Sequence, residues 1–291
     1  MHKYLRSIGF GCVTEMAQLD RLVEDVITNY DRKKAVETEN HRLFAAISKE
    51  YGYDCGITVC GTYDEQDRFR MEYYFPYFTG SQITTYENIA IERHAGFESY
   101  AGACDDFRVG ISLIFYLVNA ADYINVLHNG LLRDIKTSLT LSALAESGKI
   151  LLPIQKDDVL QKEEEKLLQK RNSLIAAARS GDEEAMESLT MEDIDVYTSL
   201  TRRIQNEDLY SIVDTYFMPY GIECDQYSIM GEIAECNRTV NEMTGARMYQ
   251  LGILSNDIPL DICISEDDLL GEPEIGRRFK GNIWLQGMIN F

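Results

Sequence analysis

The chain of 291 residues is long enough for a sizeable hydrophobic core and for more than one domain. Its 48 acidic and 28 basic residues give a net charge of −20, a sign that repels phosphate backbones and anionic membrane surfaces. This charge disfavours nucleic acid and membranes as partners, and the hydrophobic fraction of 45% excludes global disorder.

The first 156 residues are predicted to form a mostly antiparallel sheet domain that begins with helices. Helical spacing of apolar residues predicts helices at 14–29 and 41–50. Strand patterns follow at 57–63, 68–78, 87–95, 109–118, 137–144 and 149–155, with a short helix at 120–128. Turn residues at 64–67 and at 147–148 predict that 57–78 and 137–155 are hairpins.

The period of the apolar residues changes to 3.6 at residue 157 and predicts helices as far as Phe217, just before the Pro219–Gly221 break. Strands are predicted again at 228–234, 246–254, 258–264 and 277–291, with a helical turn at 265–270. Three strands, a short helix and one or two more strands resemble the order of an OB-type barrel. We therefore predict an α+β protein with a sheet domain (1–156), a helical connector (157–221) and a small OB-like β-barrel (222–291).

Cysteine usage and the N-terminal residues bear on localisation. The seven cysteines are scattered, odd in number and without a Cys-x-x-Cys pair, which argues against a disulfide framework or a zinc knuckle. The first ten residues have no apolar run like that of a signal peptide, and the most apolar stretch, 109–118, is too short to span a bilayer. A cytoplasmic protein with reduced thiols is expected.

Distinctive strings are spread over the chain: Met1-His-Lys-Tyr-Leu-Arg, Met71-Glu-Tyr-Tyr-Phe-Pro-Tyr-Phe78, Glu92-Arg-His94, Val109-Gly-Ile-Ser-Leu-Ile-Phe-Tyr116, Phe217-Met-Pro-Tyr-Gly221, Glu223-Cys-Asp-Gln-Tyr227 and Gly276-Arg-Arg-Phe-Lys-Gly-Asn-Ile-Trp-Leu-Gln-Gly287. On these strings the chain resembles, over its whole length, an uncharacterised domain-of-unknown-function family from anaerobic Gram-positive bacteria. The resemblance implies a cytoplasmic protein and supplies no activity, cofactor or catalytic residue.

Glu92 and His94 are the candidate catalytic residues, because they share one face of a predicted strand. A neighbouring antiparallel strand would bring Glu72 alongside them. A carboxylate that orients an imidazole can perform general acid–base catalysis. A polar ladder on a solvated sheet face has the same pattern and is favoured, since no nucleophile motif accompanies the pair.

The aromatic run 73–78 contains two candidate ligand contacts. Tyr73 and Phe75 are expected to form core, because strands place alternate residues on the buried face. Tyr74 and Tyr77 then remain as surface residues able to stack on a ligand.

Arg278 and Trp284 form a basic–aromatic cluster on the predicted barrel, the kind of cluster that binds single-stranded nucleic acid. The acidic balance of this part of the chain opposes such binding. Ion pairing of Arg278 with Glu272 or Glu274, and packing of Trp284 in the barrel core, are favoured instead.

Asp105 and Asp106 are the candidate metal ligands, able to hold Mg²⁺ with a substrate phosphate. Adjacent carboxylates before a strand are more often a turn. The sequence has no Walker A, Gly-x-Ser-x-Gly or His-Glu-x-x-His motif, so neither a metal nor a cofactor is predicted.

The sequence thus favours a non-catalytic cytosolic binding or scaffold protein that contacts a protein partner or a second copy of itself. An enzyme that uses Glu92 and His94 is the first alternative. A single-stranded nucleic-acid binder that uses the barrel is the second.

Overall fold

The computed structural model describes residues 1–38, 41–94, 96–106, 108, 110–130, 136–153, 173–175, 177–178, 181–182, 184–189, 191 and 213–291. The chain forms two units, one made of Met1–Leu152 with Thr215–Phe291 and the other of Pro153–Asp214. Most of the predicted connector 157–221 lies outside the described residues. Within the part of it that the structure describes, residues 173–175, 177–178 and 184–189 are helical. The division into 1–156, 157–221 and 222–291 stays a prediction.

Two helical elements open the first unit, the 3₁₀ helix η1 (Lys3–Ile8) and the helix α1 (Met16–Thr28). The predicted helix at 14–29 is confirmed. It begins with a capping box, in which the Glu15 carboxylate and the Gln18 side chain each bond the other residue's backbone N–H. One face of α1 is buried, as its apolar spacing requires.

Strands β1 (Arg32–Glu37), β2 (Leu43–Gly52), β3 (Cys55–Tyr63) and β4 (Phe69–Phe78) form a four-stranded antiparallel sheet in chain order. The predicted hairpin of 57–63 and 68–78 is confirmed. The predicted helix at 41–50 is wrong, because these residues belong to β2 and pair with β1 on one side and β3 on the other. A short apolar run fits either period, and pairing on both edges decides in favour of the strand.

The second sheet has ten strands in the order β13-β8-β12-β11-β10-β14-β7-β6-β5, with β9 paired to β10. Their bounds, with those of the helices between them, are β5 (Ile89–Arg93), β6 (Tyr100–Asp106), β7 (Ile111–Leu117), α2 (Ala120–His128), β8 (Ser138–Leu151), β9 (Tyr216–Pro219), β10 (Gln226–Val240), β11 (Arg247–Ser255), β12 (Ile258–Ser265), η3 (Glu266–Asp268), β13 (Leu269–Leu270) and β14 (Arg278–Asn290). The helix predicted at 120–128 is confirmed as α2, and the strands predicted near residues 87–95 and 109–118 are confirmed as β5 and β7.

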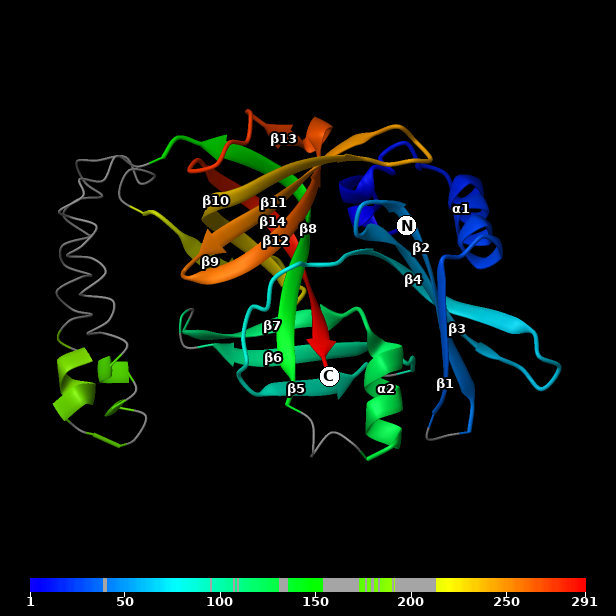
Figure 1. Ribbon diagram of the computed structural model, residues 1–291, viewed down its shortest axis with the longest axis horizontal. Coiled ribbons are helices and arrows are strands. Elements are labelled where there is room, and N and C mark those ends of the chain that lie inside the picture. The colour runs from blue at the N-terminus through cyan, green and yellow to red at the C-terminus, as the bar shows by residue number, and fades with distance from the viewer. Residues whose placement is uncertain are drawn as a thin grey trace. The chain divides into compact units, whose positions relative to one another are not determined.

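Five strands of this sheet close into a barrel, in the order β10-β11-β12-β8-β14 and back to β10. A closed barrel near the C-terminus is therefore confirmed, with η3 between β12 and β14 in the chain, as predicted. Its fifth strand is β8, which comes from much earlier in the chain and pairs in parallel with β12 (Figure 1).

Two predictions of local structure in these strands are wrong. Residues 138–151 form the single strand β8 instead of a hairpin, because β14 pairs along its whole length. Gly148 lies at the predicted turn, but a Cβ atom on it would stand 2.4 Å from the Phe279 ring, so this glycine makes room for packing. Tyr216 and Phe217, predicted as the end of a helix, belong to β9, which pairs with the edge of β10.

The four-stranded sheet, η1 and the barrel share one hydrophobic core. The buried amide of Gln286 on β14 accepts the Phe78 backbone N–H at 3.0 Å and donates to the Pro76 carbonyl at 2.8 Å, and so joins β14 to β4. The Ser7 hydroxyl donates to the Ala145 carbonyl at 2.8 Å and ties η1 to β8. Among the described residues, no helix combines the length and apolar character needed to cross a membrane.

Candidate functional site

Aromatic side chains from distant parts of the chain gather where η1, β4, β7 and β14 meet. The centroid of the Trp284 ring lies 4.6 Å from that of His2, 5.5 Å from that of Tyr4 and 5.1 Å from that of Tyr116. The backbone N–H of His2 donates to the Tyr74 hydroxyl at 2.9 Å. We define the His2 site as His2, Tyr4, Tyr74, Tyr116, Asp225 and Trp284.

Strand register explains this convergence. Tyr116 of β7 lies opposite Gln286 in the parallel pairing with β14, which brings the Tyr116 ring beside Trp284. Gln226, the first residue of β10, lies opposite Trp284, so Asp225 stands next to the indole. The indole Nε1–H donates to the Asp225 carboxylate at 2.7 Å.

The imidazole of His2 is the unusual group of the site. Its Nδ1 is buried and has no hydrogen-bond partner among the described residues. Burial is the largest cause that lowers the pKa of His2 from 6.5 to about 4, so the ring is neutral at pH 7. An unsatisfied buried polar atom costs about 1–3 kcal/mol, and few occur in a folded protein. This nitrogen therefore has an unused capacity for a hydrogen bond inside the site.

The carboxyl group of Asp225 is the second perturbed group. Burial raises its pKa above the ordinary value, and the nearby Glu223 acts in the same direction. The hydrogen bond from Trp284 and the proximity of His94 oppose this rise without cancelling it. Neighbouring groups with pKa values moved by burial are typical of functional sites, although structural networks show them too.

His94 lies at the rim of the site, where a chain of polar contacts leads inward from solvent. Its exposed ring places Nδ1 3.0 Å from the Ser99 hydroxyl, which in turn lies 3.4 Å from the Tyr116 hydroxyl. Glu92, the partner predicted for His94, is exposed on β5, and no hydrogen bond joins the two in the described part of the chain. The structure therefore pairs His94 with Ser99.

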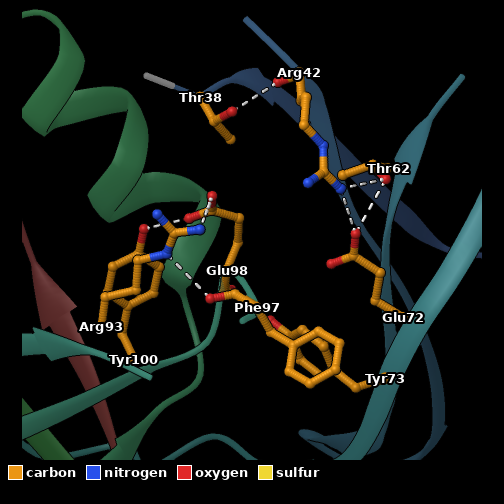
Figure 2. Close-up of polar contacts among 9 residues, drawn as sticks. All are labelled: Thr38, Arg42, Thr62, Glu72, Tyr73, Arg93, Phe97, Glu98 and Tyr100. Carbon is orange, nitrogen blue, oxygen red and sulfur yellow. Dashed lines mark hydrogen bonds and ion pairs between the residues drawn. The ribbon is translucent and has the colours of Figure 1, made fainter. Parts of the chain in front are cut away.

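Glu72, the third residue of the predicted catalytic group, is held on the four-stranded sheet. Its carboxylate accepts hydrogen bonds from the Arg42 guanidinium at 2.7 Å and the Thr62 hydroxyl at 3.1 Å (Figure 2). Those partners make Glu72 part of a cross-strand polar ladder. No contact among the described residues joins it to His94.

A second carboxylate, Glu98, was not predicted. Its side chain is 9% exposed, pairs with Arg93 at 2.7 Å and accepts the Tyr100 hydroxyl at 2.7 Å. Figure 2 shows Tyr73 reaching this turn from β4, where its hydroxyl donates to the Glu98 carbonyl at 2.6 Å. The cluster anchors the β5–β6 hairpin to β4. The sequence analysis did not identify this cluster, because it did not predict strand β6.

Tyr77, Arg278 and Trp284, three of the four candidate ligand contacts, are buried, and Trp284 packs in the hydrophobic core as favoured. Tyr77 was expected on the surface, but the end of β4 packs against β14, and burial raises the pKa of this hydroxyl. The Arg278 guanidinium donates to the Leu152 carbonyl at 3.1 Å. Of the four predicted ligand contacts, the structure thus brings Tyr74 and Trp284 together through His2.

Asp105 and Asp106, the candidate metal ligands, lie on β6 with their side chains on opposite faces. Burial alone would raise the pKa of Asp106, but hydrogen bonds from Arg108 outweigh it and lower this pKa. The Arg108 guanidinium lies 2.6 Å from Asp106, and Asp105 accepts the Ser112 hydroxyl. In the residues that the structure describes, no group of three potential ligands could hold a metal ion.

The fold defines an α+β protein in which a four-stranded antiparallel sheet shares its core with a five-stranded barrel, and an aromatic site lies between them. Residues 5–287 match the family described as "Domain of unknown function, E. rectale Gene description (DUF3881)", and the chain belongs to this family. The resemblance predicted from the sequence strings is confirmed. Comparisons with curated proteins and with solved structures gave no match.

Proposed function

We propose that this protein binds a small ligand at the His2 site. The observation that carries the proposal is the buried Nδ1 of His2, which has no partner among the described residues. The backbone N–H of His2 donates to the Tyr74 hydroxyl, and its ring centroid lies 4.6 Å from that of Trp284. Ligand sites combine apolar and aromatic walls with a few polar groups that fix orientation. A ligand that bonds this nitrogen would remove the cost of leaving it unsatisfied.

The chemistry of the site favours binding over catalysis. Tyr4 and Trp284 stack on each other as a buried aromatic wall, and the neutral imidazole of His2 can exchange a hydrogen bond with a ligand. We place this binding in the cytoplasm, as the scattered and odd-numbered cysteines support. Contact with a protein partner or a second copy stays a prediction.

An enzyme remains the second candidate, supported by the contact between His94 and Ser99. An imidazole 3.0 Å from a hydroxyl is the pairing that activates a nucleophile, and Asp225 lies within electrostatic reach of the same ring. The ring and the hydroxyl are also opposite each other in a hairpin, where such a contact stabilises a turn. Recovery of a bound ligand unchanged after long incubation would decide for binding.

Trp284 is the single tryptophan of the sequence, so its fluorescence reports on the site without labelling. We expect members of a small-fragment library to change this emission saturably in the wild-type protein. His2→Phe, which keeps a ring and removes Nδ1, should weaken their binding at least tenfold. His128→Phe on the exposed end of α2 is the matched control and should leave binding unchanged. A library without any saturable response, or equal binding by the two variants, would contradict the proposal.

A further inference from the structure

We infer that the ligand of the His2 site carries an ammonium group. This inference rests on the proposed function and names its chemical class. It draws on the charges around the site, the aromatic faces and a cation of the protein itself that already lies at the edge of the site.

Carboxylates act on the Tyr4 hydroxyl from several elements, and Lys3 lies over the face of the ring. Burial raises the pKa of its hydroxyl, and the carboxylates of Glu146, Asp225 and Glu223 raise it further. These carboxylates come from β8 and from the turn before β10, and therefore converge on η1 from separate elements. Such a field attracts a cationic ligand and opposes an anionic one.

Lys3 shows how this part of the site receives an ammonium group. Its Nζ lies 4.9 Å from the centroid of the Tyr4 ring, 3.3 Å from the Glu146 carboxylate and 3.2 Å from the Gln226 side-chain oxygen. The combination of an aromatic face, a carboxylate and an amide oxygen is the environment in which proteins bind organic ammonium ions. Trp284 stacks on Tyr4 and lies beside His2, so the buried aromatic cluster continues from Lys3 to His2.

The two perturbed groups fit the same ligand. Burial, the N-terminal ammonium and Lys3 together lower the pKa of His2, so the ring itself carries no charge at pH 7. Its Nδ1 can accept an N–H of the ligand. A buried carboxylate is stabilised by an adjacent positive charge, so an ammonium group would offset the burial of Asp225. A neutral ligand would leave that carboxylate with the hydrogen bond from Trp284 and the proximity of His94, which do not cancel the effect of burial.

Binding of an ammonium group is linked to the ionisation of Asp225. The ligand favours the carboxylate over the carboxylic acid, so its affinity should rise with pH through the raised pKa of Asp225. The groups that interact with Asp225 electrostatically or through hydrogen bonds are Tyr4, Glu223, Tyr227, Tyr116, His94 and Trp284. Asp225→Asn removes the ionisation and should abolish this pH dependence.

The test compares n-butylammonium chloride, butan-1-ol and sodium butanoate, which have the same chain length and differ in charge. Trp284 fluorescence is titrated with each at pH 7 and constant ionic strength. We expect saturable binding of butylammonium, binding of butan-1-ol at least tenfold weaker, and none of butanoate.

Asp225→Asn keeps the shape of the side chain and an oxygen that accepts the indole N–H, and it should weaken butylammonium at least tenfold. Asp122→Asn on α2, where the carboxylate pairs with Lys34, is the matched control and should bind as the wild type does. Equal or tighter binding of butan-1-ol or butanoate would overturn the ammonium inference and leave the site itself supported. The absence of a saturable response to all three would overturn both proposals.

Discussion

The imidazole of His2 and the indole of Trp284 lie with their ring centroids 4.6 Å apart, although they come from opposite ends of the chain. The contact forms because η1 packs on the barrel through Ser7, while β14 returns the C-terminal residues to the same end of the barrel. The Asp225 carboxylate holds the other edge of the indole. The proposed site therefore exists only in the folded first unit.

His2 should make the protein sensitive to acid. Its pKa is 6.5 when unfolded and about 4 when folded, so the unfolded state binds more protons in between and stability falls as the pH drops through that window. The shift corresponds to about 3 kcal/mol of unfolding free energy lost between pH 6.5 and 4. Carboxylates with lowered pKa values, such as Asp25 and Asp106, destabilise both proteins as the pH falls. Urea unfolding of wild type and His2→Phe at both pH values should therefore show a loss that is larger by about 3 kcal/mol in the wild type. An equal loss in the two proteins would contradict the burial of a neutral His2, and His128→Phe serves as the control.

The contribution of Asp225 to folding stability should depend on pH in the opposite direction to that of His2. Its folded pKa is raised, so the native state binds more protons than the unfolded state, and its contribution to stability declines as the pH rises above the ordinary carboxyl range. Asp225→Asn should therefore gain stability relative to wild type between pH 4 and pH 8. Urea unfolding of both proteins at pH 4, 6 and 8 measures the difference, with Asp122→Asn as an exposed control. A difference that is constant with pH would refute the raised pKa.

Glu98 and Glu92, on the same hairpin, should respond very differently to substitution. Glu98→Gln replaces a nearly buried carboxylate that pairs with Arg93 and accepts a hydrogen bond from Tyr100. The substitution should lower the unfolding free energy by about 1–3 kcal/mol. Glu92→Gln changes an exposed strand residue and should stay within about 0.5 kcal/mol of the wild type. Thermal melts near neutral pH test the contrast, and equal shifts for both variants would show that Glu98 does not anchor the hairpin.

Gly148→Ala tests the continuous strand β8. The added Cβ would meet the Phe279 ring at 2.4 Å, and overpacking of this kind costs about 1–3 kcal/mol. Gly11→Ala is the control, because a Cβ atom at Gly11 would have its nearest neighbour 3.8 Å away. Gly96→Ala is unsuitable as a control, because Gly96 has a positive φ that alanine would strain, although the space around it is open. Chemical denaturation should separate the two variants. Tolerance of Gly148→Ala would favour a flexible turn at this position over packing in the barrel.

Local patterns predicted several elements well. Helical spacing located α1 and α2, and the turn between β3 and β4 marked their hairpin. The prediction of a helix at 41–50 was wrong because ten residues with a few apolar positions fit both the helical and the strand period. The prediction of a turn at Gly148 was wrong for another reason: a sequence does not distinguish a glycine in a turn from a glycine that packs against an aromatic ring.

The candidate site was predictable only in parts. Tyr74, His94 and Trp284 were chosen for their residue types, and the structure connects them through His2, Ser99 and Tyr116. His2 and Asp225 had no sequence signal, because burial produces the properties that distinguish them. No local pattern reveals which polar atom becomes buried without a partner.

The sequence by itself determined the α+β class, the family, the acidic charge and the order of the strands that build most of the barrel, because these depend on composition and on short-range periodicity. Only the tertiary structure decided that β8 closes the barrel and that His2, Trp284 and Asp225 meet. Such long-range pairings depend on strand register and on which surfaces bury one another, and both are properties of the whole folded unit.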